Sequence, residues 1–165
     1  MPKRILSLLV DNNPGVTSRV SGLFSRRGYN IDSFSSGVTL DERFTRITLV
    51  CSGDGNILEQ ITRQLEKLED VRDIKVLEPD TSVIRELVLV KVSVNPAQRQ
   101  GVFSVANIFR ANIVDVSVDS LVIEMTGNKS KVDAFIRLLS DYEILELART
   151  GVTGLSRGAE DVTYL

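Results

Sequence analysis

The sequence contains no histidine and no tryptophan, and its 165 residues include a single cysteine. Without histidine, the chain cannot build a Ser-His or Cys-His nucleophilic dyad, and it lacks the commonest general base and the usual zinc or non-heme iron ligand. Because Cys51 stands alone, an intramolecular disulfide, a CxxC redox pair and a thiolate zinc cage are excluded within one chain. These absences argue against a catalytic protein and favour the reducing cytoplasm.

Long apolar runs and an excess of one charge are also missing. No apolar run reaches the roughly 20 residues that a membrane helix needs, and Ile5 to Val10 is too short for the apolar core of a signal peptide. We therefore expect a protein that is neither secreted nor membrane-spanning. Twenty Lys and Arg stand against 22 Asp and Glu, with the signs mixed along the chain, so nothing indicates a general nucleic-acid binder.

What remains is the composition of a globular protein, with 42% hydrophobic and 25% charged residues. The length suits one compact unit or two domains of roughly 80 residues each. Hydrophobic spacing and turn residues in the first half predict, in order, a strand over 5–10, a helix over 15–27, strands over 29–40 and 44–51, a helix with apolar positions Ile57, Ile61, Leu65 and Leu68, and a strand over 71–77.

The second half repeats this order about 80 residues later. It predicts a strand over 87–94, a helix through Val102, Ala106 and Phe109, strands over 113–116 and 121–125, a helix through Val132, Phe135, Ile136 and Leu139, and a strand over 144–148. Proline and small polar residues in between read as a linker over 79–84. We therefore predict an α+β protein of two tandem ferredoxin-like βαββαβ domains, residues 1–78 and 85–165, each an antiparallel sheet with both helices on one face.

This fold hosts many functions, so the residues at its loops must decide between them. RNA-recognition motifs of the same topology stack bases on aromatic residues in the middle of strands one and three. Here strand one has no aromatic residue, and strand three has only Phe44, at its start. Metal-carrying relatives need a CxxC in the first loop, where this chain has Asp11, Asn12 and Asn13. Both functions are excluded by these positions.

The first loop, residues 11–15, carries the chemistry of a binding site. Asn13 is suited to cap the first helix with Pro14 at its first position, and Gly15 lets the backbone approach a bound group closely. A helix N-terminus attracts a carboxylate, and Asp11 or Asn12 could then receive an ammonium group, so a zwitterionic amino acid fits the loop. The same residues also suit a plain strand-to-helix turn.

With the loop in this position, the sequence resembles the ACT domain, the amino-acid-sensing module of metabolic enzymes. A larger set of segments, which together cover almost the whole chain, resembles the small, regulatory subunit of acetolactate synthase. The matching segments are Arg4–Ser7, Asn12, Pro14–Val16, Ser18–Val20, Gly22–Phe24, Arg27–Ile31, Leu58–Ile61, Gln64–Leu65, Lys67–Leu68, Arg85–Leu87, Leu89–Val92, Ile108–Arg110, Asp115–Val116, Lys131–Phe135, Ala148–Gly151 and Gly154–Gly158.

The resemblance implies a non-catalytic regulatory subunit. Its partner would be the catalytic large subunit, which carries thiamine diphosphate, magnesium and FAD and condenses pyruvate with a second 2-oxo acid. The small subunit would activate that enzyme and confer feedback inhibition by valine, with leucine and isoleucine as alternative effectors, in branched-chain amino acid biosynthesis. The family also implies a homodimer of ACT domains paired through their second strands, which are edge strands in this topology.

Together, the loop and the resemblance predict a valine site between paired ACT domains. Its expected residues are Asp11, Asn12, Asn13, Pro14, Gly15, Val16, Asn30 and Ile31. Two alternatives remain at this point. One is an ACT-type sensor that serves a different metabolic enzyme or regulator. The other is a small enzyme that uses carboxylates such as Asp11 or Glu124, although the sequence holds no paired carboxylates at a fixed spacing.

Overall fold

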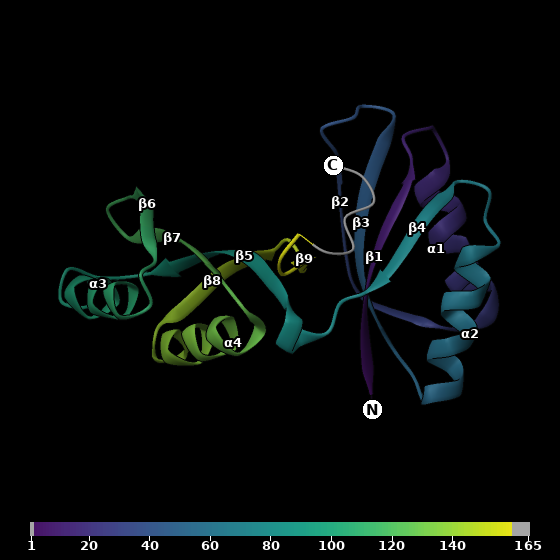
Figure 1. The fold of residues 1–165 in the computed structure, drawn as a ribbon. Helices are drawn as coiled ribbons and strands as arrows, with labels where there is room; N and C mark the ends of the chain where they lie inside the picture. Colours follow the sequence, from purple (N-terminus) through teal and green to yellow (C-terminus); the bar gives the residue numbers. More distant parts are fainter. Residues whose placement is uncertain (1, 160–165) are drawn as a thin grey trace. The chain divides into compact units, whose positions relative to one another are not determined.

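The computed structural model describes residues 2–159. Residue contacts divide the chain into two compact units (Figure 1). One unit contains the chain up to Ile84 together with the chain from Val152 onward, and the other contains Arg85–Gly151. Within residues 2–159, none of the helices combines the length and the apolarity that crossing a membrane requires.

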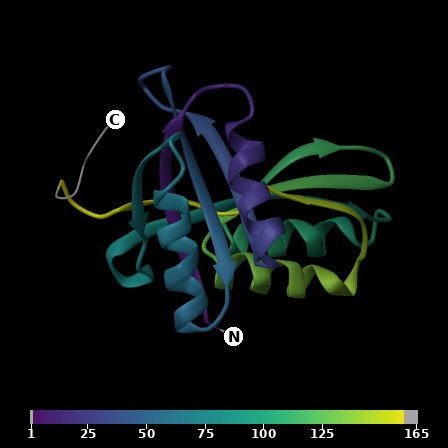
Figure 2. The same cartoon turned by 90° about the vertical axis from the view of Figure 1, so that its right-hand side faces the viewer.

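The N-terminal unit is a four-stranded antiparallel sheet with strand order β2-β3-β1-β4. Its elements are β1 (Lys3–Asp11), α1 (Val16–Arg27), β2 (Asn30–Val38), β3 (Phe44–Ser52), α2 (Gly55–Glu66) and β4 (Val71–Val76). Figure 2 shows both helices on the side that faces the viewer, with the strands behind them. The predicted order of elements and the predicted placement of both helices on one face are confirmed.

The core of this unit lies between the sheet and its two helices. Alternate residues of β1 and β3 point toward the helices, as the two-residue period of a strand requires. The fully buried side chains include Leu6, Leu8, Ile47, Leu49, Cys51, Val20, Phe24, Ile61 and Leu65. Cys51 is therefore an apolar core residue, and its burial raises the pKa of its thiol to about 11.

Local capping defines where the helices begin and end. Asp54 caps α2, because its carboxylate accepts a hydrogen bond of 2.9 Å from the backbone N–H of Ile57. Gly28 ends α1 in a left-handed conformation, with φ of 68°. Both signals could be recognised in the sequence, and the observed helix over residues 16–27 agrees closely with the predicted one.

The C-terminal unit repeats the arrangement with strand order β6-β7-β5-β8. Its elements are β5 (Ser82–Ser93), α3 (Arg99–Ile108), β6 (Asn112–Val116), β7 (Ser120–Gly127), α4 (Lys129–Leu138) and β8 (Glu143–Arg149). Its buried core residues include Val88, Val90, Val92, Val102, Leu121, Ile123, Val132 and Phe135. The second half therefore has the fold that the repeated order of elements predicts.

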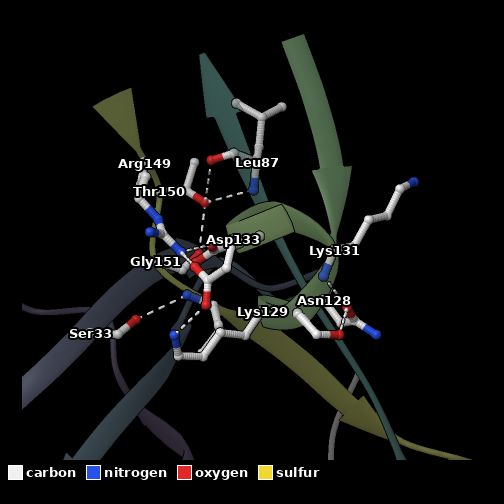
Figure 3. A network of polar contacts seen from close by, with 12 residues as sticks. Ser33, Leu87, Asn128, Lys129, Lys131, Asp133, Arg149, Thr150 and Gly151 are labelled. Atoms are coloured by element: carbon white, nitrogen blue, oxygen red, sulfur yellow. Dashed lines mark hydrogen bonds and ion pairs between the residues drawn. The ribbon is translucent and has the colours of Figure 1, made fainter. Parts of the chain in front are cut away.

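One buried ion pair belongs to this unit. The Glu86 side chain is only 5% exposed and pairs with the guanidinium group of Arg149, which also lies 3.6 Å from Asp133 of α4. Lys129 pairs with the same Asp133 at 2.7 Å (Figure 3). The network joins β5, β8 and α4, so it connects both ends of the polypeptide segment that forms the unit.

The end of the described chain returns to the N-terminal unit. A strand that the sequence did not predict, β9 (Thr153–Ser156), pairs with β5. The backbone N–H of Val152 donates to Ser33 Oγ at 2.9 Å, and that of Arg157 donates to the Thr81 carbonyl at 2.8 Å. Residues 79–84, predicted as a linker, form a 3-10 turn, η1 (Pro79–Thr81), and the first part of β5. The compact C-terminal unit therefore ends at Gly151, whereas the predicted domain extends to residue 165.

Candidate ligand-binding loop

A pocket of about 270 Å³ lies where β1 and β2 end. Both strands run antiparallel to β3, so their C-terminal ends lie at the same end of the sheet, beside the start of β3. Its lining residues are Val10, Asp11, Asn12, Asn13, Val16, Thr17, Ser36, Gly37, Val38 and Thr45. The volume is below the range of pockets that hold drug-sized ligands, so it suits a small metabolite.

The pocket contains four of the predicted site residues and several that were not predicted. Asp11, Asn12, Asn13 and Val16 line it directly, while Pro14 and Gly15 belong to the same loop. The unpredicted residues are Val10 and Thr17, beside the loop, together with Ser36 to Val38 at the end of β2 and Thr45 of β3. Pairing the predicted strands in the predicted topology would have brought the β2 and β3 residues to this end of the sheet, so the signal was present in the sequence.

The predicted cap of the first helix is wrong. The N-cap residue is Gly15, in a left-handed conformation with φ of 85°, and no side chain caps the helix. Asn13 lies two residues before this N-cap. Its backbone carbonyl accepts from the Val16 N–H at 3.4 Å, but its side chain does not cap the helix. Glycine at the N-cap costs only roughly a few tenths of a kcal/mol relative to Ser, Thr, Asn or Asp, and without a side-chain cap the positive end of α1 stays open to another acceptor.

Asn12 ties the loop to the tip of the β2–β3 hairpin. Its backbone N–H donates to the Arg43 carbonyl at 2.8 Å, and its side-chain Nδ2 donates to the Glu42 carbonyl at 2.8 Å. An asparagine amide also has an oxygen that accepts. One N–H of this amide is therefore used for structure, and its Oδ1 is the group that can accept from a ligand donor.

Asp11 is held by a cation from the neighbouring strand β4, in which Val71 is opposite Val10. Arg72, in β4, donates to the two carboxylate oxygens of Asp11 at 2.7 and 2.9 Å. In the neighbouring pair the charges are reversed. Here the residue beside the loop is the cation, Arg19 of α1, which donates to Asp70 at 2.6 and 3.1 Å. Hydrogen bonding with Arg19 lowers the pKa of Asp70, and the same bond raises the pKa of Arg19.

Asn30 and Ile31 lie at the other end of the sheet from the pocket. Asn30 begins β2 and is opposite Ser52, whereas the pocket residue Val38 ends β2 and is opposite Thr45. The Asn30 amide donates to the carboxylate of Asp32, and Ile31 packs partly buried against the core. Within one chain, these two residues therefore do not join the loop.

The carboxylates named for an enzyme alternative lie in different units. Glu124 of β7 is opposite Leu89 and Asn112 in the C-terminal sheet, while Asp11 ends β1 in the N-terminal unit. Among residues 2–159, no three His, Cys, Asp or Glu side chains gather in a way that could hold a metal ion. The geometry thus offers a polar loop and pocket, with Asp11 already engaged by Arg72.

Comparisons with known proteins agree with this architecture. Residues 6–73 match a family model described as an AHAS small subunit-like ACT domain, and residues 85–158 match one described as the small subunit of acetolactate synthase. The acetolactate synthase small subunit of Mycolicibacterium smegmatis is 47% identical over 161 residues, which covers 98% of this chain and 95% of that protein.

Two further relatives come from other organisms, and one of them is a solved structure. A probable acetolactate synthase small subunit of Methanothermobacter thermautotrophicus is 48% identical over 156 residues, covering 94% of this chain and 93% of that protein. The crystal structure of the acetolactate synthase small subunit from Thermotoga maritima has a TM-score of 0.89 and 38% identity, covering 96% of this chain and 99% of the other.

The fold and the loop define an ACT-domain protein with a second ferredoxin-like domain of the same topology. The full-length matches make the assignment more specific. The chain belongs to the family of acetolactate synthase small subunits, so the resemblance seen in the sequence is confirmed.

Proposed function

We propose that this chain is the regulatory subunit of an acetolactate synthase, which activates the catalytic large subunit and confers feedback inhibition by valine. It would act in the cytoplasm, in branched-chain amino acid biosynthesis, and the thiamine diphosphate, magnesium and FAD would be held by the partner. The observation that carries the proposal is the uncapped N-terminus of α1 at the mouth of the pocket, in a chain of this family.

The loop has chemistry for each part of an aliphatic amino acid. The ligand carboxylate would accept from first-turn backbone N–H groups of α1 that follow Val16, since the Val16 N–H already donates to the Asn13 carbonyl and no side chain caps the helix. The ammonium group would donate to Asn12 Oδ1, because Arg72 already engages the Asp11 carboxylate. The apolar lining consists of Val10, Val16 and Val38, and it favours a branched aliphatic side chain.

A homodimer would complete this site. β2 is an edge strand of the N-terminal sheet, and antiparallel pairing with a second copy would cover that edge. A two-fold axis near Phe34 would then place Asn30 of the second copy opposite Val38, at the pocket. Its exposed amide could add a hydrogen bond to the ligand across the seam.

Inhibition would follow from a shift between two arrangements of the dimer. Valine can inhibit only if it binds one arrangement better than the other, so that the activating arrangement loses occupancy. A coupling free energy of about 1–3 kcal/mol gives roughly five- to 150-fold regulation. This mechanism requires no covalent chemistry from the small subunit.

The test is a thermal-shift screen of the purified chain against the twenty amino acids. Ligand at about 100 times its Kd adds roughly 2.7 kcal/mol of stability, which raises Tm by several degrees. Valine should produce this shift with the wild type, and the variants Gly15→Asp and Asn30→Ala should lose it. The matched controls are Gly28→Asp, at the other left-handed glycine of α1, and Asn112→Ala, at the equivalent first position of β6.

The outcomes separate the possible sensors. A shift with a different amino acid alone would favour an ACT-type sensor serving another enzyme. A valine shift that Asn30→Ala retains would contradict the site at the dimer seam. The absence of a shift with any amino acid would contradict valine sensing by the isolated chain.

A further inference from the structure

The loop is fastened to one short segment of the N-terminal unit, where α2 leads into β4. Asp70 and Arg72, two residues apart, bind Arg19 and Asp11, which flank the loop on either side. Each pair is a two-pronged guanidinium–carboxylate contact, and the backbone N–H of Asp11 also donates to the Asp70 carbonyl at 2.9 Å. We refer to these four side chains as the double clamp.

The geometry of the double clamp differs from that of an ordinary surface ion pair. Both aspartate side chains are only 17–18% exposed, and the paired residues are 51 and 61 positions apart in sequence. The Arg63–Glu59 pair of α2, by comparison, spans one helical turn at 3.5 Å with both side chains more than 60% exposed. Two-pronged contacts fix the direction as well as the distance of the groups that they join.

Both clamp pairs also place charge directly at the ligand loop. Asp11 lines the pocket, and Arg19 Nη1 lies 2.9 Å from the position that a Cβ on Gly15 would occupy. As long as the pairs are intact, the negative charge of a carboxylate and the positive charge of a guanidinium group offset each other at each side of the loop. Breaking either pair would leave one uncompensated charge beside the pocket, negative in one case and positive in the other.

We propose that Arg72 and Asp70 are positioning residues that set the charge preference of the pocket, so that it selects a zwitterion over a cation or an anion of the same shape. This deepens the amino-acid-binding function proposed above and rests on it. Neither residue lines the pocket, and each acts through its partner on the loop. The electrostatic effect of an unpaired charge at this range is large enough to be measured as a change in relative affinity.

Calorimetric titration of three related ligands tests the proposal. L-valine is a zwitterion, L-valinamide is a cation because its carboxylate is replaced, and 3-methylbutanoate is an anion because it lacks the ammonium group. In Arg72→Gln, the Kd of valinamide relative to that of valine should fall by about fivefold to tenfold, because Asp11 is left unpaired. In Asp70→Asn, the Kd of 3-methylbutanoate relative to that of valine should fall by a similar factor, because Arg19 is left unpaired.

Two further variants separate charge preference from general support of the fold. Arg72→Lys keeps the cation and should retain the wild-type ratio of valinamide to valine. Arg63→Gln removes an ion pair of the same unit away from the loop and should change neither ratio. If Arg72→Gln and Asp70→Asn weaken all three ligands equally, the double clamp only supports the fold and the proposal is overturned.

A wild-type chain that binds no amino acid would overturn the proposed function itself. The double clamp is then tested by amide hydrogen exchange, which needs no ligand. Arg72→Gln should raise the exchange rate of the Asp11 N–H, which bonds to Asp70, while Arg63→Gln should leave it unchanged. An unchanged rate in Arg72→Gln would overturn the clamp as a positioning device.

Discussion

The two glycines that bound α1 predict a matched pair of substitutions. Both have a positive φ, 85° at Gly15 and 68° at Gly28. A Cβ on Gly15 would lie 2.9 Å from Arg19 Nη1, whereas no atom lies within 4 Å of a Cβ on Gly28. Alanine therefore strains the backbone at both positions, but only at Gly15 does it also push against a guanidinium group that Asp70 holds in place.

The magnitude follows from the backbone conformation. A left-handed conformation costs a non-glycine residue about 1–2 kcal/mol. Part of this, about 0.4–1 kcal/mol, is offset because alanine also restricts the unfolded chain. Gly28→Ala should therefore lose about 1 kcal/mol of stability, which lowers Tm by roughly 4–8 °C for a domain of 60–100 residues, and Gly15→Ala should lose at least as much because of the contact with Arg19.

Ligand binding should distinguish the two variants more clearly than stability does. Thermal unfolding followed by circular dichroism gives Tm, and calorimetric titration gives the Kd of valine. Gly15→Ala should weaken valine binding by about tenfold or more, a change of about 1.4 kcal/mol, because the start of α1 must move. Gly28→Ala should bind like the wild type. Equal losses of affinity in both variants, or wild-type affinity in Gly15→Ala, would refute the placement of the ligand at this helix end.

Three further predictions concern the core and the charged network. The buried Cys51 thiol, with its pKa raised to about 11, should react with a disulfide reagent only at the rate of unfolding, so fast labelling of the folded chain at pH 8 would contradict its burial. Arg149→Leu leaves Glu86 buried without its cation and should destabilise the C-terminal unit by about 3–5 kcal/mol in urea unfolding, and a loss below 1 kcal/mol would show that the pair is dispensable. Hydrogen bonding to Arg43 holds the pKa of Asp41 at about 2. Since that value lies below the unfolded value of about 3.9, the contribution of the pair is present at pH 6 and is lost as pH falls from about 5 toward 2. Urea unfolding of Asp41→Asn beside the wild type should show a difference that shrinks on acidification, and a growing difference would contradict the sign.

Local patterns in the sequence were sufficient to predict most of the fold. The helix over residues 16–27 could be read from its apolar spacing and from Gly28, and α2 could be read from Asp54 and its stripe. The strand β9 could not, because its four residues show no clear alternation. It forms through pairing with β5, and Gly154 allows this close approach, since a Cβ there would lie 2.9 Å from the Val83 carbonyl oxygen.

The candidate site was predicted in part, and the missing part depends on long-range contacts. The loop itself follows from Pro14 and Gly15 after an aliphatic strand. The partner of Asp11 lies 61 residues away, so no local spacing indicates Arg72. The predicted asparagine cap is wrong because the residue type alone does not decide where α1 begins. Asn13 has a suitable side chain, but the left-handed conformation of Gly15 makes Gly15 the N-cap residue.

The central claim is that this chain regulates an acetolactate synthase by binding valine at the loop. The most direct measurement is acetolactate formation by the catalytic large subunit of the same organism, with the chain titrated in, with and without valine. We predict that the chain raises the rate, that valine reverses this increase, and that Gly15→Asp raises the rate without responding to valine. An unchanged rate at saturating chain, or equal inhibition by valine with Gly15→Asp, would contradict the account.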